Sequence, residues 1–408
     1  MTQRTGQSTT ARRPLSIAVI GAGPVGLSLA LHASRALPDA ALSLFDARPA
    51  EKDVSGDPRT LALSLGSVQL LERLGAWRAE LAQPILEVHV SQQPPSTLPL
   101  LGDWFGEPEL RIRAIDEAVP LLGAVLSYGS IVAPLQQVWM AAEAAEPKRL
   151  RSRFGQPVAA LKNLGDGVEV DAGIAERFDL AIVAEGGVFA DQARKAVTHD
   201  YQQTAWVGRV AFEPGAEPRA RGVAFERFTH HGPAALLPLK DGGAGLVWCV
   251  TSGDDQVREL SDAQRVTVLN TIFHPAAGRI ASITPLKDFA LGLNAERTLT
   301  DGRTVRIGNA AQTLHPVAGQ GLNLGLRDAF ELVHALARDR DVDAVLRRLE
   351  WQRGPDRWAM IAATDFLARS FTWRLPGAGA ARGVGLAALQ ALGPLRSALA
   401  RQMMFGRR

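Results

Sequence analysis

The chain has little cysteine, little net charge and no cluster of metal ligands, and each shortage excludes a class of protein. Only one of the 408 residues is cysteine, Cys249, so no internal disulfide can form, which fits a reducing compartment. The formal net charge is +3, and the positive charges are scattered as single arginines, which argues against nucleic-acid binding. His and Cys do not occur at zinc-type spacing, so no metal site is predicted. Cys249 stands in the apolar run 245–250, where we expect a buried, inert thiol.

Long uninterrupted apolar runs are also scarce. Residues 17–33 are nearly long enough to span a bilayer and follow Arg12 and Arg13, as in a twin-arginine export signal. Three glycines and Pro24 interrupt this run, and no small-residue cleavage site follows it. We therefore expect a cytoplasmic protein with a polar, disordered N-terminal tail. The length of 408 residues is too great for one core and predicts two domains.

A glycine fingerprint follows the first strand-like run. Gly21, Gly23 and Gly26 come directly after the apolar segment 15–20 and open a helical pattern. In this context the first glycine makes a tight turn, the second admits a pyrophosphate, and the third lets helix and strand pack closely. Asp46 ends the next strand-like run and can accept the ribose hydroxyls of an adenosine. The segment predicts binding of FAD or NAD in preference to NADP, the alternative being a plain βαβ unit.

A second glycine-rich segment, 308–326, runs from the end of a short strand into an apolar helical pattern. Gly319 and Gly321 allow backbone to come close to a ligand. The helix expected to begin near Gly321 would point free N–H groups and the positive end of its dipole at that ligand. Because a reduced flavin carries negative charge at N1 and the C2 carbonyl, this segment suits a flavin. The alternative is a turn that serves packing alone.

The two glycine segments and four others resemble, in chain order, the FAD-dependent aromatic hydroxylases, and among them the ubiquinone-biosynthesis hydroxylases. The other four segments are 57–77, 179–186, 201–205 and 225–239. Asn309 and Gln312 stand where many relatives have Asp and His, and this version is most similar to hydroxylases of 2-polyprenyl-6-methoxyphenol. One departure is Glu185, which stands where the family usually has Asp.

The resemblance implies an α/β fold similar to that of p-hydroxybenzoate hydroxylase. A Rossmann-type FAD-binding domain, with a parallel, doubly wound sheet, would comprise residues 14–84, 114–187 and 299–350. A mixed-sheet substrate domain, residues 85–113 and 188–298, would interleave with it. A helical segment, 351–408, would follow, with breaks at Pro376 and Gly379.

The resemblance also implies an FAD-dependent monooxygenase that hydroxylates the ring of a polyprenylated phenol in ubiquinone biosynthesis. It would use O2 and NAD(P)H, the latter as a transient co-substrate, by way of a flavin C4a-hydroperoxide. Two alternatives stay open. One is a flavin-binding scaffold of a quinone-synthesis complex that has lost catalytic activity, as the replacement of the family's Asp by Glu185 could indicate. The other is a flavin reductase or halogenase, although no lysine in a Trp-rich motif, typical of halogenases, is found.

The family roles transfer to individual positions. The cofactor-binding residues would be Gly21, Gly23 and Gly26 at the pyrophosphate, Asp46 at the ribose, Arg59 at the flavin and its phosphates, Glu185 near the pyrophosphate, Asn309 at the ribityl chain, and Gly319, Gly321 and Asn323 at the pyrimidine edge. Pro316 and His315 would be catalytic, with Pro316 at the ring where oxygen is activated. Arg59 could instead be a surface arginine, and His315 could cap a turn. His230 and His231 could supply a hydrogen bond to the phenol, but neighbours on a strand face opposite ways, so at most one would point inward. We expect neither to contact substrate.

The C-terminal segment from residue 383 is apolar and ends in arginines. Leu386, Leu389 and Leu392 share one helical face, as do Leu395, Leu399 and Met403. Such a helix could rest on the inner face of the membrane, with Arg396, Arg401, Arg407 and Arg408 toward anionic lipid. The alternative is that the helix covers the protein's own core or an interface, including one with other quinone-biosynthesis proteins.

Overall fold

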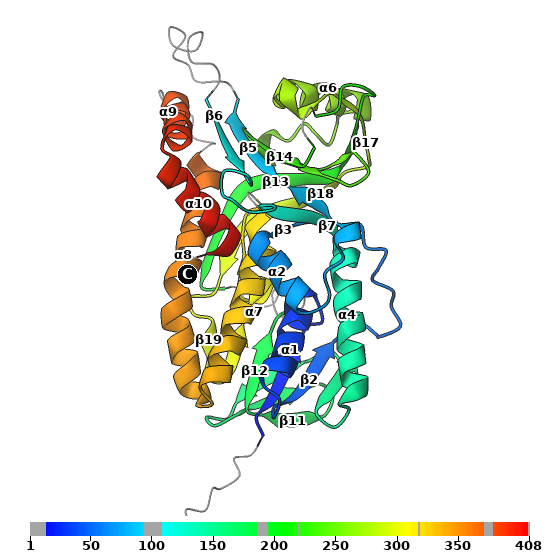
Figure 1. The fold of residues 1–408 in the computed structure, drawn as a ribbon, viewed down its shortest axis with the longest axis vertical. Helices are drawn as coiled ribbons and strands as arrows, with labels where there is room; N and C mark the ends of the chain where they lie inside the picture. The colour runs from blue at the N-terminus through cyan, green and yellow to red at the C-terminus, as the bar shows by residue number, and fades with distance from the viewer. Residues whose placement is uncertain are drawn as a thin grey trace, which may run out of the picture.

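The computed structural model describes residues 14–93, 108–185, 195–218, 221–316, 319–370 and 378–406. The expected N-terminal tail, the break at Pro376 and the last two arginines lie outside these ranges. Two α/β halves stack along the long axis of the molecule (Figure 1). Strands and helices from distant parts of the sequence alternate between the halves, as expected for interleaved domains.

A six-stranded sheet forms the core of the first half. Its order is β19 (Thr300–Asp301), β20 (Thr304–Arg306), β12 (Leu180–Val183), β1 (Ser16–Ile20), β2 (Ala41–Asp46) and β8 (Leu150–Phe154). All neighbours from β20 to β8 are parallel. Parallel strands are buried on both faces, which explains why β1 and β12 are almost wholly apolar.

Different kinds of layer cover the two faces of this sheet. One face packs against helices α1 (Pro24–Ala36), α4 (Tyr128–Ala145) and α7 (Gln320–Arg338) around a large apolar cluster. The other face packs against a three-stranded antiparallel sheet of β9 (Ala160–Asn163), β10 (Val168–Asp171) and β11 (Ala175–Phe178). The expectation of a doubly wound sheet is therefore wrong, because strands and not helices cover the second face. The connection 155–179 between β8 and β12 forms this antiparallel sheet in place of a crossover helix.

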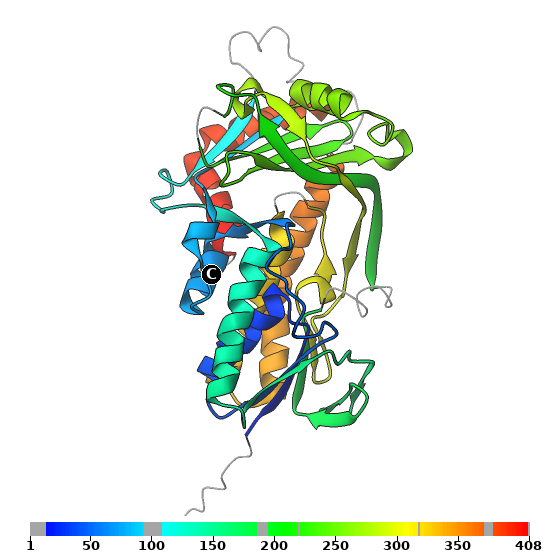
Figure 2. The same cartoon turned by 90° about the vertical axis from the view of Figure 1, so that its right-hand side faces the viewer.

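A nine-stranded mixed sheet forms the second half (Figure 2). Along its main path the order is β21 (Gln312–Thr313), β18 (Lys287–Ala295), β13 (Val197–Phe212), β16 (Ala244–Thr251), β15 (Gly232–Pro238), β14 (Val223–Thr229), β5 (Glu87–Gln92) and β6 (Glu109–Arg113), with β17 (Ile280–Ile283) beside β13. Only the pair β14–β5 is parallel, so the sheet is mixed, as predicted. Helix α6 (Asp262–Ile272) covers its outer face around Trp206 and Trp248.

Strand β13 is unusually long and carries a bulge. The register with β18 shifts between Asp200 and Gln203, and Gln202 has a positive φ of 52°. The Asp200 carboxylate accepts a hydrogen bond of 2.8 Å from the Gln202 amide, which stabilises this conformation. A bulge re-aims the side chains beyond it, and here it directs Gln203 toward the segment before α7.

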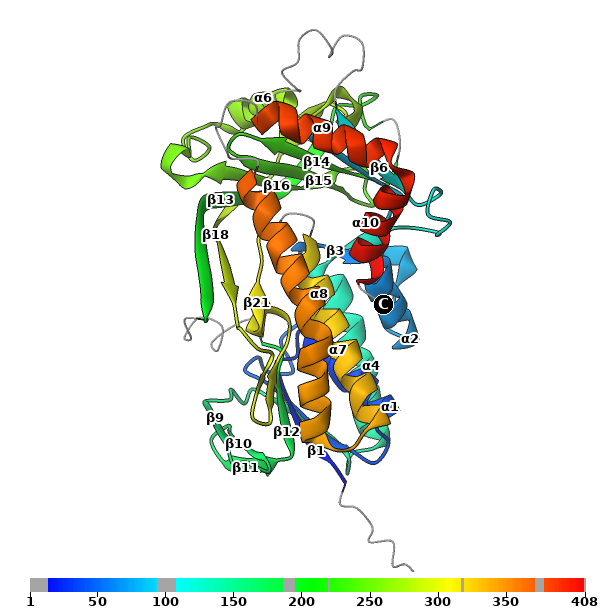
Figure 3. The same ribbon diagram turned by 90° about the vertical axis from the view of Figure 1, so that its left-hand side faces the viewer.

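A small sheet and the last helices join the two halves. The order of the small sheet is β3 (Thr60–Ser64), β7 (Gly123–Ser127) and β4 (Gln83–Ile85), and α2 (Leu65–Arg73) follows β3 directly. Helix α8 (Val342–Ser370) runs along both halves, α9 (Ala378–Ala391) lies along β6, and α10 (Gly393–Phe405) descends toward α2 (Figure 3). The prediction of a helical C-terminus is right, but Gly379 is not a break, because it lies inside α9.

Candidate cofactor and substrate site

Four predicted cofactor residues follow four neighbouring parallel strands. Asn309 comes after β20, Glu185 after β12 and Gly21 after β1, and Asp46 ends β2. Ile20 is in register with both Val183 and Phe45, so these strand ends lie at one level. Ligands of open α/β sheets bind outside the carboxyl ends of the strands. Residues from opposite ends of the sequence thus meet at one edge.

The three glycines of the fingerprint have different neighbours. Gly21 has φ +101°, and a Cβ there would lie 2.8 Å from the Glu185 amide nitrogen. A Cβ on Gly26 would lie 1.8 Å from the Gly21 carbonyl oxygen. At Gly23, by contrast, a Cβ would meet only the Tyr128 hydroxyl, at 3.5 Å. The fold itself therefore requires glycine at the first and third positions, whereas the second is open toward a ligand.

Asp46 fixes the glycine loop to the end of β2. Its carboxylate accepts hydrogen bonds from the Ala22 amide at 2.5 Å and from the Arg48 amide at 2.7 Å. The Arg48 guanidinium donates to Gln136 on α4 at 3.0 Å, so that it stands beside the loop and Asp46. Sequence reasoning missed Arg48, although an arginine two residues after the acidic strand end was a visible signal.

Glu185 lies half-buried beside Gly21. Burial raises the pKa of its carboxyl group, and the negative charge of Asp46 raises it further. Two carboxylates at one sheet edge leave room for hydroxyl or amide donors of a ligand, but they repel phosphates. Glu185 therefore suits a sugar or ring of the cofactor better than its pyrophosphate, and the residue after it lies outside the described ranges.

Arg59 and Tyr128 line the open side of the glycine loop. The Arg59 guanidinium lies 4.0 Å from the centre of the Tyr128 ring, and it pairs with Asp57 at 2.8 Å. The side chain of Arg59 is 63% exposed, so it can reach a ligand at Gly23 without a desolvation cost. This exposure also fits the alternative of a surface arginine, so the cofactor contact of Arg59 stays a prediction. Tyr128 was missed, although it is one of only two tyrosines and begins α4.

Asn309 sits in a single 3-10 turn, Gly308–Ala310, after β20. The side chain of Asn309 is exposed at the sheet edge. Its backbone carbonyl accepts a hydrogen bond of 2.6 Å from the buried Lys195 ammonium group. Lys195 is a second residue that sequence reasoning missed, because nothing in the spacing links it to this turn. It anchors the turn that presents Asn309.

Gly319 and Gly321 stand at the start of α7. Gly319 adopts the left-handed conformation, φ 59°, and caps the helix without a side-chain hydrogen bond. A Cβ on Gly321 would have no atom within 4 Å. The first amide groups of α7 are therefore not shielded by a capping side chain, which is the arrangement predicted for an anionic ring edge.

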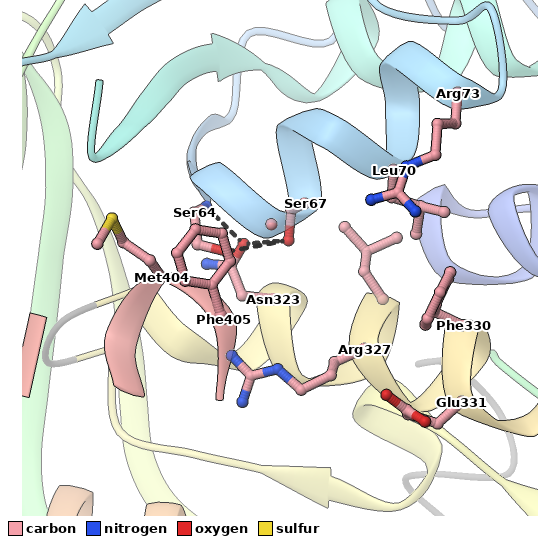
Figure 4. A pocket seen from close by; sticks show the side chains of 12 residues that line it. Ser64, Ser67, Leu70, Arg73, Asn323, Arg327, Phe330, Glu331, Met404 and Phe405 are labelled. Carbon is pink, nitrogen blue, oxygen red and sulfur yellow. Dashed lines mark hydrogen bonds between the residues drawn. The ribbon is translucent and has the colours of Figure 1, made fainter. Parts of the chain in front are cut away.

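Asn323 makes its contacts within the protein (Figure 4). Its carbonyl oxygen accepts hydrogen bonds of 2.8 Å from both the Ser64 amide and the Ser67 hydroxyl. Its amide donates to the carbonyls of Ala62 and Gly319, each at 3.0 Å. Only 3% of Asn323 is exposed. Its side chain therefore holds β3 and the turn at Gly319 together, and the expected direct contact with the flavin edge is not supported.

His315 is buried between Gln203 and Tyr201. Its Nε2 lies 2.9 Å from the Gln203 side-chain oxygen, and its ring meets that of Tyr201 edge-on at 5.2 Å. Desolvation lowers the pKa of His315 to about 4, so the ring is neutral near pH 7. These contacts favour a positioning role over the predicted catalytic role. Pro316 is half-buried next to it, and its carbonyl accepts from the Gly319 amide at 3.0 Å.

Other predicted residues lie away from this edge. Cys249 is buried in β16, and burial raises the pKa of its thiol, as expected for an inert group. His230 and His231 are exposed in the turn between β14 and β15. The argument from strand alternation was therefore wrong for this pair, although neither histidine points into the sheet interior.

The residues at the carboxyl edge fit FAD. The position at Gly23 would admit a pyrophosphate, the uncapped start of α7 would suit an anionic ring edge, and the exposed Asn309 would be available to the linking chain. Arg48 and Arg59 supply positive charge near the glycine loop.

Comparison with known proteins agrees with this geometry. The family described as FAD binding domain matches residues 182–362. The chain is 29% identical to 3-demethoxyubiquinol 3-hydroxylase of Escherichia coli, over 94% of this chain and 97% of that protein. It is also 29% identical to ubiquinone hydroxylase UbiL of Rhodospirillum rubrum, over 97% of this chain and 90% of that protein.

Solved structures share the fold. p-Nitrophenol 4-monooxygenase PnpA of Pseudomonas putida superposes with a TM-score of 0.69 at 15% identity, covering 97% of this chain and 99% of that chain. Klebsiella pneumoniae HpxO complexed with FAD and uric acid gives 0.68 at 16% identity, covering 96% and 97%. The predicted fold class, with its FAD-binding half and mixed-sheet half, is confirmed. The chain is thus an FAD-dependent monooxygenase that is similar, over most of its length, to ubiquinone-biosynthesis hydroxylases.

Proposed function

We propose that this protein hydroxylates the aromatic ring of a polyprenylated phenol in ubiquinone biosynthesis, with O2 and NAD(P)H as co-substrates. The observation that carries the proposal is the alignment of the glycine loop, Glu185 and Asn309 at one sheet edge, opposite the mixed sheet. The names of the relatives, 3-demethoxyubiquinol 3-hydroxylase, ubiquinone hydroxylase and ubiquinone biosynthesis monooxygenase, support the choice of substrate class.

The chain's own residues bind and orient in this mechanism. Gly23 and the start of α1 hold the pyrophosphate, with Arg48 and Arg59 beside it, and Asn309 holds the linking chain. When bound at these residues, FAD would supply the redox chemistry that hydroxylation with NAD(P)H and O2 requires. The amides at the start of α7 stabilise negative charge on the ring edge.

Pro316 and the buried pair His315–Gln203 shape the approach to the ring. Because His315 is neutral, it orients the segment 312–316 through its hydrogen bond and does not supply a proton. Tyr201 packs on the same histidine, and burial raises the pKa of its hydroxyl well above the ordinary value.

A non-catalytic scaffold is the second candidate, and Glu185 is the feature that motivates it. Glu185 keeps a carboxyl group at the strand end, and the neighbouring backbone contact with Gly21 is intact. These features favour a functional site over a decayed one. Glu185→Asp separates the two candidates, because a catalytic protein should keep turnover in both forms.

Contact with a membrane is a further part of the proposal. The helical faces expected to meet lipid are mostly used by the protein, since Leu386 is buried and Leu389, Leu399 and Met403 are half-buried. An apolar outer face remains on α9 and α10, where Val384, Leu392 and Leu395 are 58%, 53% and 50% exposed. No helix in the described ranges is long and apolar enough to cross a bilayer. We infer that this outer face rests on the membrane surface.

Two experiments test the proposal. Purified protein with FAD, NAD(P)H and O2 should convert a prenylated methoxyphenol to a product heavier by one oxygen, detected by mass spectrometry. NAD(P)H oxidation without that product would contradict the function. For the membrane, Leu392→Glu with Leu395→Glu should reduce co-sedimentation with anionic vesicles, because burying a charge in lipid is costly. Ile174→Glu, on the exposed β10–β11 turn, is the matched control; equal binding by all forms would contradict the contact.

A further inference from the structure

An apolar cavity lies between the two halves, beneath α10. Its apolar lining comes from β3, β4, β5, β6, the start of β7, and α10: Ala62, Leu63, Ile85, Val88, Ile112, Leu122, Ala400, Met403 and Met404. Ser64, Gln320 and Asn323 line its polar end. No charged side chain of the described residues lines it. A concave site with a mainly apolar lining and a few polar groups at one end is typical of small-molecule binding.

A neighbouring pocket has the opposite character. It shares Ser64, Asn323 and Met404 with the apolar cavity but lies between α2 and α7, where Arg73, Arg327 and Glu331 line it (Figure 4). Because charges are concentrated on one side of the Ser64–Asn323 contact, the two pockets select different ligands. A hydrocarbon chain would be accepted by the cavity beneath α10 and rejected by its neighbour.

The polar end of the cavity adjoins the proposed ring-binding site. Gln320 is the first residue of α7, directly after Gly319. A Cβ on Gly319 would touch Ala62, another lining residue, at 3.5 Å. A ligand with an aromatic head and an apolar tail could therefore place its head beside the proposed flavin site and its tail beneath α10.

Helix α10 forms a wall of this cavity and is held from several sides. Ser397 donates to Glu117 at 2.7 Å, and Gln402 donates to Asp356 on α8 at 2.8 Å. Gly66 permits close contact, since a Cβ there would lie 2.8 Å from the Met404 carbonyl oxygen. The residues of α10 that line the cavity are the small Ala400 and the two methionines Met403 and Met404, whose side chains can adapt their conformation to a ligand.

We propose that this cavity binds the hydrocarbon chain of the substrate, with α10 as the wall that sets how much chain is accepted. The inference rests on the proposed function, because it assigns the tail of the same prenylated phenol. It goes further by giving the inner and outer faces of α10 different tasks, chain binding and membrane contact.

The test compares two phenols with the same ring, one carrying a farnesyl chain and one a methyl group. Ala400→Leu fills the cavity and should lower the farnesyl-to-methyl ratio of kcat/KM about tenfold or more, since a few methylene groups of misfit are worth that much. Ala398→Leu makes the same change on the exposed side of α10 and should leave the ratio unchanged. An unchanged ratio in an FAD-containing Ala400→Leu protein overturns the inference.

Direct binding separates failure of this inference from failure of the proposed function. Met403→Glu places a charge in a half-buried wall position that the folded protein can solvate, but that a bound chain would desolvate. Its dissociation constant for the farnesyl phenol, measured by calorimetry, should rise about tenfold or more. If the wild-type protein binds the chain with this dependence but forms no product, only the proposed function fails. If Met403→Glu binds the farnesyl phenol as tightly as wild type, the cavity is not the chain site.

Discussion

At the scale of single residues, the glycines near the cofactor differ in what surrounds them. Gly21 and Gly26 are in close contact with backbone atoms, whereas Gly23 and Gly321 have open space where a side chain would stand. The sequence motif assigned the first and third glycines to the turn and the packing, and the second to the ligand. The packed structure agrees with this division, because it leaves no room for a side chain at Gly21 and Gly26.

This difference predicts opposite outcomes for two substitutions in one loop. Gly23→Val should fold but lose stoichiometric FAD, because the added side chain occupies the place of the pyrophosphate. Gly26→Ala should destabilise the protein itself, since its Cβ would lie 1.8 Å from the Gly21 carbonyl oxygen. Flavin absorbance and thermal unfolding of the apoprotein distinguish the two. A yellow Gly23→Val protein would show that the pyrophosphate is held elsewhere.

His315 predicts a dependence of stability on pH. Its folded pKa of about 4 lies below the ordinary value of 6.5. The unfolded chain therefore binds the proton more tightly, so the contribution of His315 is present in full above pH 6.5 and is lost as the pH falls toward 4. His315→Gln should flatten the fall in unfolding free energy between pH 6.5 and 4, measured in urea. His199→Gln, at an exposed position of β13, serves as the control; a curve for His315→Gln parallel to wild type would contradict the assignment.

At the scale of elements, the contact between α7 and α8 depends on buried charges. Arg353 donates to Asp328 at 2.8 Å and to Asp356 at 2.7 Å, and all three side chains are nearly inaccessible. Asp356 also bonds Arg327 and Gln402, so that α7, α8 and α10 meet at one carboxylate. Burial raises the pKa of the Asp328 carboxyl group, whereas the nearby Arg353 guanidinium lowers it. The charged form of Asp328 is therefore stabilised by Arg353. This network fixes the helix whose first turn faces the cofactor.

Removal of one partner should therefore be severe. Arg353→Met leaves Asp328 buried without its main partner and should cost about 3–5 kcal/mol of unfolding free energy. Arg369→Met, on the same helix but at an exposed pair with Asp365, should cost less than about 1 kcal/mol. Urea denaturation measures both. Equal small losses would indicate that Asp328 takes up a proton or a new partner.

At the scale of the whole molecule, FAD would connect segments that are far apart in the sequence. The site draws on residues 21–26, 46–59, 185 and 309–321, which come from both ends of the chain. A ligand that binds only the folded state stabilises it by mass action. The last helices cover the region between the two halves of the molecule. There α10 packs against α2 and lines the cavity described above.

FAD should accordingly raise the melting temperature in a concentration-dependent way. At a hundredfold excess over its dissociation constant the gain is about 2.7 kcal/mol. Differential scanning fluorimetry with increasing FAD measures this, and Gly23→Val should show no such increase. A protein whose melting temperature ignores FAD while binding it would require equal affinity of the unfolded chain.

The sequence by itself determined the local features: the strands and helices around both glycine segments, the inert cysteine, the FAD-binding fold and most residues at the sheet edge. Hydrophobic periodicity and turn chemistry act over short distances, so they are readable from spacing. The tertiary structure decided what each side chain meets. It placed Asn323 among protein partners, buried His315 beside the bulged strand, and brought Tyr128, Lys195 and Arg48 to the site, because these contacts join segments whose pairing no local pattern encodes. It also divided the C-terminal apolar face between cavity and surface, since burial depends on the neighbours that the folded chain supplies.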